Sequence, residues 1–111
     1  MNDHNPWYSG NGRVPFGWTV AADGKSISRC FIYPDFLQAF AFMRRAAIAA
    51  ERWGHHPEWS NVYNRVDARL TTHDTGGLTD KDYIMAQEMN DLSGFPDPDL
   101  DQIIAAARAG A

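Results

Sequence analysis

The chain has 111 residues, a length typical of one domain; 44% of its residues are hydrophobic and 22% are charged. Its formal net charge of −4, with no block of Lys and Arg, argues against a nucleic-acid-binding surface. The single cysteine, Cys30, excludes an internal disulfide and a cysteine-rich metal site. The sequence has no long apolar stretch and its N-terminus does not resemble a secretory signal, so we expect a cytoplasmic location.

The first third of the chain predicts an irregular arm followed by a hairpin. Residues 1–17 are rich in Gly, Pro and Asn, a composition typical of irregular structure. Residues 18–33 then predict two short strands around the dipeptide Asp23-Gly24, which suits a tight turn.

A helix is predicted after this hairpin. Asp35 is a suitable N-cap, Gln38 follows three residues later as in a capping box, and Gly54 provides the end of the helix. Apolar side chains recur at helical spacing, and we predict that they form the core-facing stripe: Phe36, Phe40, Met43, Ala47 and Ala50. This stripe is assigned to packing rather than to a cofactor.

The second half of the chain predicts a strand and two more helices. Residues 61–72 alternate between apolar and polar side chains, which predicts one long strand with a buried face. A loop around Gly76 leads to a helix that is capped by Thr79 and runs to about Leu92. Residues 93–111 contain a break and then a short amphipathic helix with an apolar face: Leu100, Ile103, Ile104 and Ala107.

This order of elements indicates an α+β fold, in which helices pack on an antiparallel sheet. We divide the chain into the arm at residues 1–17, a domain at residues 18–92 and a C-terminal extension at residues 93–111.

The segment GHHPEWSNVYN, residues 54–64, holds the adjacent pair His55 and His56, and His73 follows nearby. A turn after the helix would allow both to face one pocket, and His73 could join them if the chain folds back. Imidazoles titrate near neutral pH, so such a group suits proton transfer.

Other residues around the histidines suggest a binding pocket. Glu51 lies one helical turn before His55 and could orient its imidazole. Trp59 offers a flat apolar wall for a planar ligand. A zinc site is disfavoured, because adjacent histidines rarely bind one tetrahedral ion and no His pair has i, i+4 spacing. Asp74, adjacent to His73, has the same difficulty as a ligand, so we predict no metal.

Two long motifs resemble those of the pterin-4a-carbinolamine dehydratases. They are E-x-x-x-H-H-P-E-W-x-N-V-Y-N-x-V at residues 51–66 and L-x-T-H-D-x-G-G-L-T-x-x-D at residues 70–82. The segment F-I-Y-P-D-F-x-x-A-F-x-F-M, residues 31–43, is also similar to the family's strand-to-helix segment. The resemblance covers residues 18–92. It implies a four-stranded antiparallel sheet with helices on one face, and homodimers or homotetramers built through the sheet.

The resemblance also implies a reaction, the dehydration of a 4a-hydroxytetrahydropterin to the quinonoid dihydropterin. This reaction needs no cofactor and recycles the pterin used by aromatic amino-acid hydroxylases. By the same resemblance, His55, His56 and His73 have the acid–base and pterin-binding roles. We assign acid–base work to His55 and His73 and binding to His56. The further candidate substrate-binding residues are Glu51, Pro57, Trp59, Thr72 and Asp74.

The two ends of the chain differ from the family pattern. The family usually begins with a helix, whereas residues 1–17 look irregular, and it usually stops after the helix that matches residues 79–92. Some dehydratase-like proteins assist the assembly of RuBisCO instead, and others bind transcription factors. The alternative is therefore a protein-binding scaffold. The complete histidine set favours the enzyme, because a scaffold has no chemical need for it.

Overall fold

The computed structural model describes residues 14–110, so most of the predicted arm, residues 1–13, lies outside the described residues. The elements, in chain order, are β1 (Thr19–Val20), β2 (Ile27–Ile32), α1 (Phe36–Trp53), β3 (Glu58–Val62), β4 (Arg65–Leu70), the 3-10 helix η1 (His73–Thr75), α2 (Asp80–Ser93) and α3 (Pro98–Ala109).

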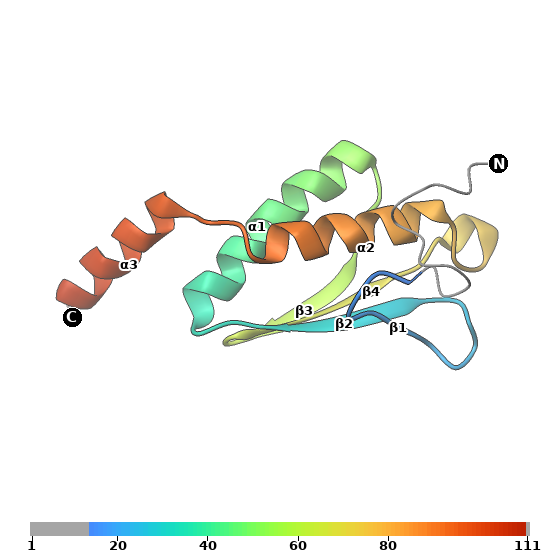
Figure 1. Cartoon of the computed structure of the whole chain (residues 1–111), viewed down its shortest axis with the longest axis horizontal. Helices are drawn as coiled ribbons and strands as arrows, with labels where there is room; N and C mark the ends of the chain where they lie inside the picture. Colours follow the sequence, from blue (N-terminus) through green and yellow to red (C-terminus); the bar gives the residue numbers. More distant parts are fainter. Residues whose placement is uncertain (1–13, 111) are drawn as a thin grey trace.

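The four strands form one antiparallel sheet in the order β1-β2-β4-β3. Figure 1 shows α1 and α2 side by side on one face of this sheet, while α3 extends away from it. Alternate strand residues point toward the helices and are buried, among them Ile27, Phe31, Val66 and Leu70. The predicted α+β fold, with a four-stranded sheet and helices on one face, is confirmed.

The prediction of one long strand at residues 61–72 is wrong, because the chain reverses at Tyr63 and Asn64. Tyr63 adopts a positive φ of 51°, and β3 and β4 then pair with Val62 opposite Arg65. Two hydrogen bonds hold this turn against the residue that follows β2: Tyr33 N–H donates to Asn64 O, and Asn64 Nδ2 donates to Tyr33 O. The two-residue turn moves Val62 to the exposed face, where its side chain is 59% exposed.

The predicted core stripe of α1 is only partly right. Ala50 is buried and Met43 packs against the core, but Ala47 is exposed, and Phe36 and Phe40 are 44% and 53% exposed. The buried face consists of Ala39, Ala41, Phe42, Ala46, Ala49 and Ala50. Phe42 sets this orientation, since its ring centroid lies 4.5 Å from that of Phe31 in the sheet. The many alanines make α1 apolar on several sides, so spacing alone did not identify the face that packs.

The remaining predictions of local structure agree with the observed elements. Asp35 caps α1 by accepting a hydrogen bond from Gln38 N–H, and Thr79 caps α2. The hairpin around Asp23 forms, although β1 is only two residues long. In α3 only Ile104 is buried. No helix within residues 14–110 is long and apolar enough to cross a membrane.

Candidate active site

The end of α1 gives the site its shape. Gly54 adopts the left-handed conformation, with φ 65°, which a residue with a Cβ adopts only with strain. The chain turns there, and His55 and His56 come to lie beside η1, which carries His73. All three histidines line one pocket of about 310 Å³. The structure thus brings the three candidate histidines together in one pocket. The full lining is Gly54, His55, His56, Thr71, Thr72, His73, Asp74 and Lys81.

Each of the three histidines has a carboxylate against its Nε2 atom. The Nε2-to-oxygen distances are 2.6 Å from His55 to Asp82, 2.6 Å from His56 to Glu51 and 2.8 Å from His73 to Glu58. The expected contact between Glu51 and His55 is therefore wrong. The left-handed turn at Gly54 directs His55 toward α2 and leaves the exposed His56 to contact the last turns of α1.

The carboxylate beside His55 is fully buried at the start of α2. Asp82 Oδ1 contacts His55, while Asp82 Oδ2 accepts hydrogen bonds from Thr72 Oγ1 at 2.7 Å and from the Thr79 N–H at 2.9 Å. The His55 side chain is only 12% exposed. Sequence reasoning missed Asp82 as a site residue, although the Thr79-x-x-Asp82 spacing of a capping box was a visible signal.

These carboxylates determine which ring nitrogen can react. A carboxylate can only accept hydrogen bonds, so the Nε2 atom that faces it carries the proton. In the neutral imidazole the lone pair then lies on Nδ1, and in the imidazolium Nδ1 provides the transferable proton. The same rule applies to His55, His56 and His73, because each meets its carboxylate through Nε2.

The carboxylate beside His73 lies at the surface. Glu58 also pairs with Arg69, and the side chains of His73 and Glu58 are 78% and 47% exposed. The hydrogen bond from His73, helped by Arg69, holds the pKa of Glu58 below its usual range. Glu58 was not predicted as a site residue, although it stands inside the His-His-Pro-Glu motif.

The other predicted site residues divide into two groups. Thr72 and Asp74 line the histidine pocket. Pro57 and Trp59 do not line it; Trp59 stands opposite Ala68 on β4 and packs against the hydrophobic core. Lys81 lines the pocket and had no signal in the sequence analysis.

A second cavity adjoins the histidine pocket. Its volume is about 480 Å³, and it shares Thr72, Asp74 and Lys81 with the first. The two hollows therefore open onto a common wall at the start of α2. Within residues 14–110, no group of three or more His, Cys, Asp or Glu side chains could hold a metal ion.

Fold and site together define a small α+β protein with a pocket of histidines oriented by carboxylates, suited to acid–base chemistry. The family model for pterin 4 alpha carbinolamine dehydratase matches residues 10–92, and the chain belongs to this family.

Relatives and a solved structure agree with this assignment. A protein of Mesorhizobium japonicum, provisionally named a pterin-4-alpha-carbinolamine dehydratase, is 53% identical over 77 residues, which cover 69% of this chain and 79% of the relative. A relative in Sinorhizobium fredii with the same provisional name is 48% identical over 83 residues, 75% of this chain and 79% of its own. A crystal structure from Brucella melitensis, described as a transcriptional coactivator/pterin dehydratase, is 47% identical with a TM-score of 0.69. That match covers 71% of this chain and 84% of the other.

Proposed function

We propose that this protein dehydrates a 4a-hydroxytetrahydropterin to the quinonoid dihydropterin. The observation that carries the proposal is the set of three histidines in one pocket, each with its Nε2 atom against a carboxylate. Membership of the pterin dehydratase family supports the same chemistry.

The reaction requires two proton transfers. The N5 lone pair of the substrate expels the C4a hydroxyl group, the departing oxygen takes up a proton and leaves as water, and N5 loses its own proton. Two imidazoles in different protonation states can perform both transfers near neutral pH. We assign these transfers to Nδ1 of His55 and Nδ1 of His73, and we assign substrate binding to His56.

The dimensions and the lining of the pocket suit a substrate of this size. Cavities that bind small molecules usually have volumes of about 300–1,000 Å³. The histidine pocket of about 310 Å³ and its neighbour of about 480 Å³ reach that range, and they share a wall. Along that wall, Thr72 and Asp74 offer oxygen acceptors to ring N–H and amino groups, and Lys81 offers a donor to a carbonyl oxygen. No cofactor takes part in the proposed reaction.

A direct dehydration assay tests this function. Purified protein is mixed with 4a-hydroxytetrahydropterin generated in place by an aromatic amino-acid hydroxylase, and formation of quinonoid dihydropterin is followed by absorbance above the uncatalysed rate. A folded protein that gives no acceleration would overturn the proposal.

A second candidate function is the binding of another protein. The description of the Brucella structure includes a coactivator role, and this chain exposes large apolar side chains on α1 and α3. They are Phe36, Phe40, Ile48 and Ile103. Loss of binding to a partner protein in Phe40→Ser, with dehydration activity unchanged, would favour this second candidate. A hydroxylase partner and a RuBisCO partner both stay predictions.

We also propose that the protein forms homodimers or homotetramers. β3 is an edge strand of the sheet, and an open edge pairs readily with another strand. Pairing of such edges between subunits would extend the sheet, as the family resemblance implies. Light scattering across micromolar concentrations should give at least the dimer mass, and a monomer throughout would contradict this.

A further inference from the structure

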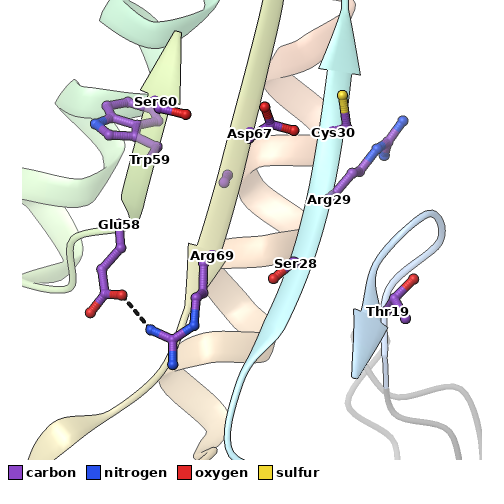
Figure 2. Close-up of a pocket in the computed structure, with 10 residues that line it drawn as sticks. Thr19, Ser28, Arg29, Cys30, Glu58, Trp59, Ser60, Asp67 and Arg69 are labelled. Carbon is purple, nitrogen blue, oxygen red and sulfur yellow. Dashed lines mark hydrogen bonds and ion pairs between the residues drawn. The ribbon is translucent and has the colours of Figure 1, made fainter. Parts of the chain in front are cut away.

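The side chain of Glu58 connects the histidine pocket with the exposed face of the sheet. Glu58 is the first residue of β3 and stands directly opposite Arg69 of β4 in the strand register. Figure 2 shows the two side chains pointing toward each other from neighbouring strands, joined by their ion pair. The second carboxylate oxygen of Glu58 lies 2.8 Å from Nε2 of His73. One carboxylate thus contacts a pocket histidine with one oxygen and a strand arginine with the other.

The order of the elements explains this three-residue arrangement. His73 opens η1, shortly after the end of β4, while Glu58 follows the turn that carries His55 and His56. The ion pair therefore ties the two segments that supply all the pocket's histidines. Arg69 is held by the cross-strand register, and it can only donate hydrogen bonds, so it keeps Glu58 as an acceptor.

We propose that Glu58 is a positioning residue of the dehydration reaction, which holds His73 in the tautomer with its lone pair on Nδ1, and that Arg69 in turn holds Glu58. This inference rests on the proposed function. Among the three pocket histidines, His73 is the most exposed, with 78% of its side chain exposed. The surrounding protein packs against little of the ring, so the bond to Glu58 is what restricts its orientation and tautomer.

The ion pair of Glu58 and Arg69 makes this restraint persistent. The pKa of Glu58 lies below its usual range, first because of the hydrogen bond from His73 and then because of Arg69. Glu58 is therefore an acceptor throughout the neutral range. A glutamine at this position would be different in kind, since its amide can donate as well as accept and can therefore face either tautomer of His73.

The test compares the wild type with Glu58→Gln, Arg69→Gln and the double variant. Asp67→Asn is the matched control, because Asp67 pairs with Arg65 at 3.0 Å on the same sheet face. Figure 2 shows Asp67 on the neighbouring part of the sheet, away from the pair of Glu58 and Arg69. Two quantities are measured: kcat and KM for dehydration, and the ¹⁵N chemical shifts of the His73 ring, which report the nitrogen that carries the proton.

We expect Glu58→Gln to lower kcat about fivefold, equivalent to ~1 kcal/mol and the upper end for an exposed ion pair, with KM changed less than about twofold. The His73 ¹⁵N signals should move from the Nε2-protonated form toward a mixture of tautomers. Arg69→Gln should lower kcat about twofold, and the double variant should be no worse than Glu58→Gln, because Arg69 acts through Glu58. Asp67→Asn should match the wild type in both measurements.

Three outcomes would overturn the proposal. They are an unchanged kcat in Glu58→Gln, unchanged His73 ¹⁵N signals in Glu58→Gln, and an equal loss of kcat in Asp67→Asn. A wild type without dehydration activity would overturn the proposed function and, with it, the part that Glu58 plays in the reaction. The ¹⁵N spectra would then still decide whether Glu58 fixes the tautomer of His73. Urea unfolding of each variant checks that the fold is retained.

Discussion

His55 and His73 line the same pocket and each has its Nε2 atom against a carboxylate, but the two carboxylates lie in different surroundings. Asp82, beside His55, is fully buried and bonded to three donors, whereas the side chain of Glu58, beside His73, is 47% exposed. A buried polar group costs much free energy when it loses its partners, and an exposed one is solvated by water. The His55–Asp82 end of the pocket should therefore contribute to the stability of the fold. The His73–Glu58 end should contribute little.

Replacing each histidine by alanine tests this comparison most strongly. If both imidazoles transfer protons, His55→Ala and His73→Ala should each lower kcat by roughly 10²–10⁴-fold. Only His55→Ala should also lower the free energy of unfolding, by about 1–3 kcal/mol, because it removes a partner from the buried Asp82. Dehydration kinetics and urea unfolding of both variants provide the measurement. Full activity in both would show that the catalytic assignment is wrong, and equal stability losses would remove the contrast between the two ends.

The difference between the two carboxylates also explains what the sequence could predict. The three histidines were identifiable because an uncommon residue type is clustered in a long motif. Their partners were harder to identify, because Glu51 lies one helical turn before His55 in the sequence and was therefore the expected partner. The left-handed turn at Gly54 changes this neighbourhood, and the partner of His55 comes from α2, 27 residues away. A contact of that kind depends on the packing of two helices, which local spacing does not encode.

Replacing Asp82 tests the buried end directly. Asp82→Ala leaves His55 Nε2, Thr72 Oγ1 and the Thr79 N–H without their acceptor, and it also breaks the capping box of α2. We expect the free energy of unfolding to fall by about 3–5 kcal/mol, as for other buried polar pairs that lose one partner. Asp101→Ala, at an exposed position of α3, is the control and should change it by less than about 0.5 kcal/mol. Similar losses in the two variants would refute the structural role of Asp82.

The fold itself was predicted in its class and in most of its elements, and its two errors have one cause. The strand at residues 61–72 and the stripe on α1 were both read from the period of apolar residues. A two-residue turn at Tyr63 and Asn64 leaves an alternating pattern looking continuous. An alanine-rich helix likewise offers several apolar faces, and tertiary packing of Phe42 on Phe31 selects one of them. The spacing of apolar residues identifies a helix or a strand, but it does not always give where that element ends or which side is buried.

The third pair, His56 with Glu51, gives a smaller test at the rim of the pocket. Both side chains are exposed, 60% and 79%, so their contact should contribute little. If His56 binds the substrate, Glu51→Gln should raise KM by about twofold and leave kcat unchanged, because it affects a binding group only. Steady-state kinetics at neutral pH measures both constants. A lower kcat would instead place Glu51 and His56 in the proton transfers.

The smallest expected effect concerns the acid stability of the exposed end. The pKa of Glu58 is lowered in the folded protein, by the hydrogen bond from His73 and then by Arg69, so the charged carboxylate is favoured by folding. A depressed carboxyl pKa stabilises the fold at pH values above the unfolded-state pKa, and this stabilisation is lost as pH falls through the lower, folded-state pKa. The stability difference between the wild type and Glu58→Gln should therefore be retained as pH falls to about pH 5. It should then shrink at pH values below the ordinary glutamate pKa of 4.5, as the carboxylate becomes protonated. Urea unfolding of both proteins across this range measures the difference, which should also shrink at about 1 M salt because the groups are exposed. A difference that persists undiminished at about pH 3, or that survives high salt, would mean that Glu58 is as well protected as Asp82, and the contrast between the two ends of the pocket would be lost.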